Sequence, residues 1–147
     1  MQQLTHEMIC NMIPHAGQMC LIDAVESWDD ESIICISHSH KLEENPLRAN
    51  GQLSAIHAIE FGAQSMAIHG ALLARSSHKP MPPGYLAAAR DVKFGSILRL
   101  DTLESPLRIQ STKMLSSGGN LMYSFEIHAD DEPVMSARLT VAAQVDI

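Results

Sequence analysis

The sequence contains few aromatic residues and few cysteines. Phe, Tyr and Trp together make up 4% of the 147 residues. The three cysteines, Cys10, Cys20 and Cys35, are odd in number, and no two of them have CxxC spacing. This usage argues against a disulfide framework, so we expect reduced thiols in a bacterial-type cytoplasm.

Several familiar motifs are absent as well. The chain has no GxGxxG and no GKS or GKT sequence, which argues against the common phosphate-binding loops. It has neither HExxH nor GxSxG, the signatures of zinc peptidases and of α/β-hydrolases. His38 and His40 are predicted to share one face of a strand, where two neutral surface histidines are favoured over a metal site. We therefore expect no metal and no cofactor.

The charge is negative overall but unevenly distributed. A net charge of −7 argues against nucleic acid or an anionic membrane as a partner. Residues 75–99 depart from this balance, with five basic residues and one acidic residue. We predict that Arg75, Lys79, Arg90 and Lys93 form a docking patch for an acidic partner, although a solvated loop and strand edge would have the same composition. The start of the sequence does not have the pattern of a signal peptide.

Residues 54–74 are predicted to form one long helix. The segment has no proline and is rich in Ala, Leu, Ile and Met, and Ser54 is a suitable N-cap. Small residues recur on several sides of it, which suits a helix that a sheet wraps closely. Polar residues interrupt it too often for a transmembrane span.

Glu60 is the unusual residue of this helix. No Lys or Arg lies within one helical turn of it, whereas a surface glutamate normally has charged neighbours at such spacings. If the helix is enclosed, Glu60 loses hydration, which favours its neutral form and makes it a candidate general acid. The alternative is that Glu60 lies on a narrow solvated edge. His57, one turn earlier, is placed either to share a site with Glu60 or to lie at a solvated helix end.

The rest of the chain is predicted to be mainly strands. A short helix over residues 5–12 is followed by residues 19–28, a short turn that runs into a first strand, and by a second strand at residues 32–39. A meander follows the long helix, with strands at residues 85–94, at residues 98–114 with a bend at Pro106, around residues 123–128, and at residues 135–145. This order predicts a single α+β domain, residues 1–147, in which one helix lies against a strongly curved antiparallel sheet.

Two segments resemble a known family. PHAGQMCLID, residues 14–23, is similar to the PH-x-x-x-M-x-L-[IV]-D signature of the FabA/FabZ-type 3-hydroxyacyl-acyl-carrier-protein dehydratases. IEFGAQ, residues 59–64, resembles the L-E-x-x-A-Q stretch of their central helix, and IEFGAQSMAIHGALL with GYLAAARDV is typical of the ApeP-like branch in aryl-polyene pigment clusters. The resemblance implies a hot-dog fold, in which a curved sheet wraps one helix and two protomers join their sheets.

The same resemblance implies a reaction and a set of residues. Family members remove water from (3R)-3-hydroxyacyl chains bound to an acyl carrier protein, and Glu60 would be the acid of the catalytic pair. A backbone N–H at the helix start would polarise the thioester carbonyl, which makes Gly51, Gln52 and Leu53 substrate-binding candidates together with Gln64. The basic segment would then receive the carrier protein.

One departure from the family pattern changes the prediction. Asn45 stands about where the family has its catalytic histidine, and an amide cannot act as a base. His57, or less favourably His40, would substitute for it; alternatively the chain is a non-catalytic scaffold subunit. In a third case it pairs with a partner dehydratase that supplies a histidine to a composite site. We favour a partner dehydratase over a homodimer, and keep an acyl thioesterase as a further alternative.

Overall fold

The computed structural model describes residues 4–13, 19–77, 84–117 and 120–143. Helical and strand elements follow one another in this order: α1 His6–Asn11, β1 Ala24–Trp28, β2 Ser32–Ser37, η2 Ser39–Lys41, η3 Ala55–His57, α2 Ala58–Ser77, β3 Gly84–Phe94, β4 Leu107–Ser117, β5 Asn120–Ala129 and β6 Glu132–Ala143. None of the helices within these residues is long and apolar enough to span a bilayer.

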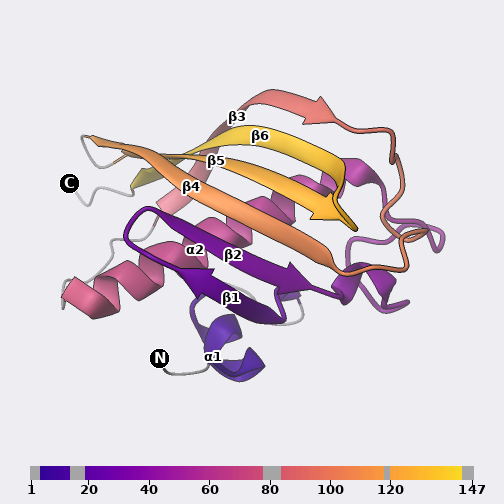
Figure 1. Ribbon diagram of the computed structural model, residues 1–147, viewed down its shortest axis with the longest axis horizontal. Helices are drawn as coiled ribbons and strands as arrows, with labels where there is room; N and C mark the ends of the chain where they lie inside the picture. Colours follow the sequence, from indigo (N-terminus) through magenta and orange to yellow (C-terminus); the bar gives the residue numbers. More distant parts are fainter. Residues whose placement is uncertain (1–3, 14–18, 78–83, 118–119, 144–147) are drawn as a thin grey trace.

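The strands form one antiparallel sheet that curves around α2. Their spatial order is β1-β2-β4-β5-β6-β3, so β1 and β3 are its edges. Figure 1 shows α2 lying along the concave side of this sheet, with α1 beside β1. The predicted α+β architecture of one long helix and a curved sheet is confirmed.

Close approach of helix and sheet depends on small residues of α2. A Cβ atom added to Gly62 would lie 2.7 Å from a ring carbon of Phe125 on β5, which is far inside van der Waals contact. Phe125 is itself buried in the core. Gly62 therefore sets how near β5 can lie to α2, as the small-residue pattern of this helix predicts.

Polar side chains buried between α2 and the sheet are paired. Ser65 Oγ lies 2.5 Å from Ser111 Oγ on β4. His69 Nδ1 lies 2.6 Å from the Tyr123 hydroxyl, and its Nε2 lies 2.7 Å from the carbonyl oxygen of Asp29. Because a carbonyl only accepts, Nε2–H donates to Asp29 and Nδ1 accepts from Tyr123, which fixes the neutral ring. Burial accordingly lowers the pKa of His69 and raises that of Tyr123 to about 12.

The structure corrects two predicted strands. Residues 98–106 are not the first half of a bent strand, because β4 begins only at Leu107. The second strand ends at Ser37, and His40 lies in the 3-10 helix η2, fully buried, while His38 is exposed. His38 and His40 therefore do not share a strand face.

The expectation of reduced cysteines is also wrong for two of the three. Cys10 and Cys20 form a disulfide, with their Cα atoms 5.5 Å apart. Helix α1 turns Cys10 toward the segment that leads into β1, and this separation falls within the usual range for bonded cysteines. Sequence spacing did not reveal the pair because folding of α1 onto that segment brings it together. Cys35 is free and buried, and burial raises the pKa of its thiol to about 12.

Candidate active site

Glu60 lies in the first turn of α2, where its carboxylate is held by a neighbour on the same helix. Its side chain is half-buried. Glu60 Oε1 accepts a hydrogen bond of 3.1 Å from Nε2 of Gln64, one turn later. The helix N-terminus contributes partial positive charge beside it. The carboxyl group is thus oriented by a donor and remains partly accessible.

Gln64 connects Glu60 to the segment that precedes β1. Its Nε2 also donates to the carbonyl oxygen of Met19 at 2.6 Å, and its Oε1 accepts from the backbone N–H of Leu21 at 2.8 Å. Both amide hydrogens and the amide oxygen are therefore engaged inside the protein, and the side chain is 3% exposed. Gln64, which we predicted to bind substrate, has the contacts of a residue that positions Glu60.

His57 lies on η3, three residues before Glu60. Ser54 caps this segment by accepting from the N–H of Ile56, as predicted, and the His57 side chain is half-buried. Residues three apart on a helical segment are neighbours on its surface, so this spacing allows the imidazole and the carboxylate to face one site. This spacing keeps His57 a candidate base.

The backbone at the helix start is already hydrogen-bonded, contrary to expectation. The Leu53 N–H donates to Asp101 Oδ1 at 3.0 Å, and the Ala55 N–H donates to the carbonyl oxygen of Leu98 at 2.9 Å. Arg99 contacts both oxygens of Asp101, and these bonds with the Leu53 N–H lower the pKa of the Asp101 carboxyl to about 2. The Leu53 N–H, one of the predicted substrate-binding groups, is therefore not free in this chain, because the segment after β3 folds back and bonds both Leu53 and Ala55.

The loop before the helix has its own internal contacts. Asn45 is buried, its Nδ2 donating to the Ser39 carbonyl oxygen and its Oδ1 accepting from the Leu47 N–H. Gly51 has φ +75° in the tight turn that pairs Ala49 with Gln52, and a Cβ there would meet open space. These contacts give Asn45 and Gly51 roles in holding the loop, and Gln52 is exposed.

His40 does not have the contacts of a catalytic base. It is fully buried, and neither ring nitrogen has a hydrogen-bond partner among the described residues. Burial lowers the pKa of His40, which keeps the ring neutral. A ring without solvent access in this chain has no route to a substrate proton.

The basic residues predicted to form one patch are spread along the molecule. Arg75 is in the last turn of α2, whereas Arg99 lies opposite Ser54 at the helix start. Arg90 and Lys93 are exposed on β3, an edge strand of the sheet. Lys79 lies outside the described residues, as do residues 14–18 of the PHAGQ segment.

Sequence reasoning missed two features, one at this site and one away from it. Asp101 and Arg99 hold the helix start, and only the fold could reveal this because they are more than forty residues from Leu53. A cavity of about 220 Å³ lies where β3, β5 and β6 meet, lined among others by Lys93, Glu126 and His128. None of its lining residues belongs to α2, so it is separate from Glu60.

A curved antiparallel sheet of this strand order around one long helix defines a hot-dog fold. Residues 7–147 match the model of the ApeP-like family, described as ApeP dehydratase, and the chain belongs to this family. No curated protein matches it.

Solved structures agree with this assignment of fold. A chain of the dehydratase heterocomplex ApeI:P from Xenorhabdus doucetiae is 20% identical, with a TM-score of 0.83, over 99% of this chain and 94% of that chain. A mutant thioesterase from Pseudomonas aeruginosa is 16% identical with a TM-score of 0.64, over 97% of both chains. A hypothetical thioesterase from Streptococcus pneumoniae with coenzyme A is 13% identical with a TM-score of 0.59, over 82% and 84%. At these identities the likeness establishes the fold alone.

Proposed function

We propose that this chain is a dehydratase-type subunit that acts on carrier-bound (3R)-3-hydroxyacyl thioesters together with a partner dehydratase. The observation that carries the proposal is Glu60, which is half-buried in the first turn of α2 and oriented by Gln64. A carboxylic acid at this place is suited to protonate a departing hydroxyl group. Membership of the ApeP-like dehydratase family supports the same reaction.

The reaction needs a base that the chain's own loop does not provide. Residues 42–53 contain no histidine, and Asn45 is engaged in holding the loop. In the proposed composite site a histidine of the partner takes the C2 proton of the thioester. Glu60 in its protonated form gives its proton to the C3 hydroxyl, which leaves as water, and the C2–C3 double bond forms. The neighbouring structure described as a dehydratase heterocomplex supports a partner of this kind.

The test uses the full chain with and without a co-expressed partner dehydratase. Dehydration of a carrier-bound 3-hydroxyacyl chain is followed by mass spectrometry of the acyl group. We expect the complex to be active, the chain alone to be inactive, and Glu60→Gln in the complex to lower kcat by about 100-fold or more, the scale of a lost general acid. Glu104→Gln, a matched change at an exposed glutamate, should leave kcat unchanged.

Three outcomes would contradict parts of this proposal. Dehydration by the isolated chain would show that no partner is needed and would favour His57 as the base. Full activity of the Glu60→Gln complex would remove Glu60 from the chemistry. Hydrolysis of the thioester without formation of a double bond would favour the thioesterase alternative.

A non-catalytic scaffold is the second candidate, and the helix start favours it. The N–H groups of Leu53 and Ala55 bond to Asp101 and Leu98, so they do not face a thioester carbonyl in this chain. In that case the chain would complete the hot-dog dimer while the partner performs dehydration with its own residues. Glu60→Gln separates the two, because a scaffold subunit tolerates it.

A further inference from the structure

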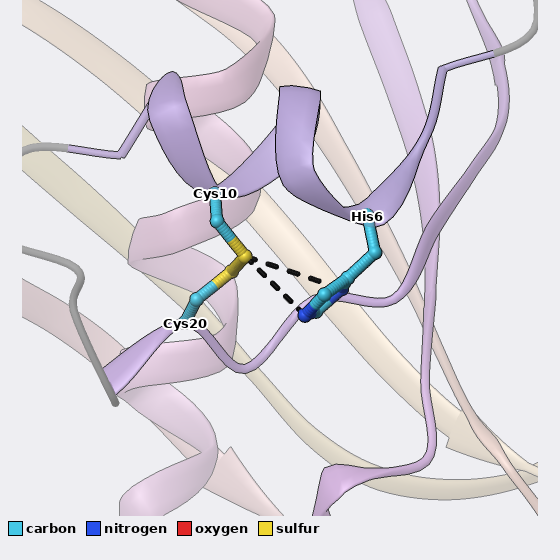
Figure 2. Close-up of side chains that lie close together, drawn as sticks. All are labelled: His6, Cys10 and Cys20. Carbon is cyan, nitrogen blue, oxygen red and sulfur yellow. Dashed lines mark hydrogen bonds between the residues drawn. A yellow bond between two sulfur atoms is a disulfide. The ribbon is translucent and has the colours of Figure 1, made fainter.

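Three side chains capable of binding a metal gather beside the N-terminal helix. His6 and Cys10 are one turn apart on α1, and Cys20 precedes β1 (Figure 2). The possible ligand atoms of the three residues all lie within 4.8 Å of one another. Cys10 and Cys20 form a disulfide, and His6 Nε2 lies 3.4 Å from the sulfur of Cys10. The cluster lies outside the candidate active site.

His6 also lies near the carboxylate of Asp23, a neighbour that the disulfide alone does not require. Nδ1 of His6 lies 3.9 Å from Oδ1 of Asp23, while Nε2 is the ring nitrogen nearer to the Cys10 sulfur. Asp23 is itself held, because its Oδ2 accepts from the backbone N–H of His38 at 2.6 Å. Metal-bound histidines use one ring nitrogen as ligand and present the other to a carboxylate. Asp23 lies on the Nδ1 side of His6, within ion-pair distance but beyond hydrogen-bond distance, so a small rotation of the exposed imidazole would complete this arrangement.

We propose that the reduced form of this cluster binds a thiophilic divalent cation, with zinc as its representative. Cys10, Cys20 and Nε2 of His6 are the ligands, and Asp23 orients His6. Two thiolates and an imidazole are a common zinc donor set, and a water or carboxylate completes four-coordination. The site departs from our expectation that the chain holds no metal, because the ligand residues converge only once α1 has folded onto the segment before β1.

The two forms of the site are related by balanced chemistry. A dithiol reductant gives two electrons and two protons to the Cys10–Cys20 disulfide and becomes a disulfide itself, leaving two thiols. Zinc then displaces one proton from each thiol and binds the two thiolates. In the reverse direction, a small disulfide takes two electrons from the two thiolates and two protons from solvent and becomes a dithiol, which re-forms the Cys10–Cys20 disulfide and releases the cation. Both the disulfide and the bound metal link α1 to the segment before β1.

This tie lies directly beside the residues that hold Glu60. Cys20 stands between Met19 and Leu21, whose backbone groups bond to the amide of Gln64, and Gln64 donates to Glu60. A disulfide bond or a metal bond at Cys20 therefore fixes the segment on which the Gln64–Glu60 hydrogen bond depends. The effect on catalysis rests on the proposed function, whereas binding of the metal does not.

The experiment measures metal binding by the full chain reduced with a phosphine, which adds no competing thiol. Zinc(II) is titrated by calorimetry, and cobalt(II) is followed by the thiolate-to-metal charge-transfer absorption. We expect one equivalent to bind, with Asp23→Asn weakening the affinity by about 10- to 100-fold, the usual effect of losing an orienting carboxylate. His6→Gln should weaken it by at least about tenfold, and Cys10→Ser should abolish the charge-transfer band. Cys35→Ser is the matched control and should leave binding unchanged.

The outcomes that overturn the proposal are specific. Binding of zinc by reduced wild type no tighter than by His6→Gln would leave the cluster a structural disulfide alone, and loss of the cobalt band in Cys35→Ser would place the metal elsewhere. His6 and Asp23 have exposed or partly exposed side chains, so their variants keep the test valid even if Cys10→Ser fails to fold.

A second measurement tests the link to the active site without any assay of activity. Hydrogen exchange at the Leu21 amide should be slower in the disulfide and zinc forms than in the open dithiol. Equal exchange in all three forms would refute the coupling. Because zinc affinity and exchange are read independently of dehydration, failure of the proposed function would leave both results interpretable.

Discussion

Three buried polar side chains of α2 each need a hydrogen-bond partner elsewhere in the fold. An unpaired polar atom inside a protein costs about 1–3 kcal/mol, and His69, Gln64 and Ser65 all lie on the enclosed sides of α2. Each is satisfied by a partner distant in sequence, on β5, before β1 or on β4. These pairs restrict the helix to one rotation and one depth against the sheet.

Removing the Tyr123 hydroxyl should show how much the stability of the protein depends on one of these pairs. In Tyr123→Phe the Nδ1 atom of buried His69 loses its donor, and we expect the free energy of unfolding to fall by about 1–3 kcal/mol, measured by urea denaturation. Ser124→Ala, on the opposite face of the same strand, is the control and should change stability by about 0.5 kcal/mol or less. A Tyr123→Phe protein as stable as wild type would show that His69 finds another partner.

At the residue scale, spacings within one helix can be read from the sequence, whereas contacts that span the fold cannot. The absence of charged neighbours around Glu60 and its spacing of four residues from Gln64 are local features. The hydrogen bond between Glu60 and Gln64 could therefore have been predicted from the sequence. The bonds of Leu53 and Ala55 to Asp101 and Leu98 depend on a chain reversal after β3. The disulfide between Cys10 and Cys20 could not be predicted for the same reason. The spacing of four residues between His6 and Cys10, however, could have indicated that these two side chains lie one helical turn apart.

At the element scale, the contact between α2 and β5 depends on the missing side chain of Gly62. Gly62→Ala gains about 1 kcal/mol of helix propensity but places a methyl group against a ring that cannot move freely. Overpacking of a core costs about 1–3 kcal/mol, and three ring carbons at 2.7–2.8 Å favour the upper part of this range. We expect net destabilisation of about 1–2 kcal/mol by thermal or urea unfolding.

A double-mutant cycle provides the control for this prediction. In a Phe125→Leu background the ring is gone, so Gly62→Ala should be neutral or stabilising, with a coupling energy of about 1 kcal/mol or more. The same loss of stability in both backgrounds would show that the alanine acts through the helix and not through Phe125.

Some element boundaries followed from local chemistry. Thr5 and Ser54 cap helical segments as their residue types suggest, and the positive φ angles of Asp130 and Asp131 fit the tight turn between β5 and β6. The segment before β4 was mistaken for strand because its apolar residues have strand-like spacing. Leu100 is buried there against the helix start instead, with its N–H bonded to Leu53.

At the scale of the whole molecule, the exposed basic residues of β3 are the surface on which we expect a carrier protein to dock. Arg90 and Lys93 lie on the edge strand of the sheet, in a chain that is otherwise acidic. Acidic partners are steered by such residues, which changes association more than chemistry.

Reversing one of these charges should separate binding from turnover. With the partner complex, Lys93→Glu should raise KM for a carrier-bound substrate by about tenfold, while kcat and the reaction of a small free thioester stay the same. Lys41→Glu, at an exposed lysine of η2, is the matched control. Equal KM values for the Lys93→Glu and wild-type complexes would place the carrier protein elsewhere.

The order of strands also has a consequence for synthesis of the chain. Among the described residues, edge strand β3 pairs with β6 alone, and β6, which begins at Glu132, is synthesised after β4 and β5. Before β6 is synthesised, the β3 segment has no strand to pair with. Long-range strand pairing of this kind is slow, and an unpaired strand is prone to aggregation. Expression alongside a binding partner, and at low temperature, should therefore raise the yield of folded protein.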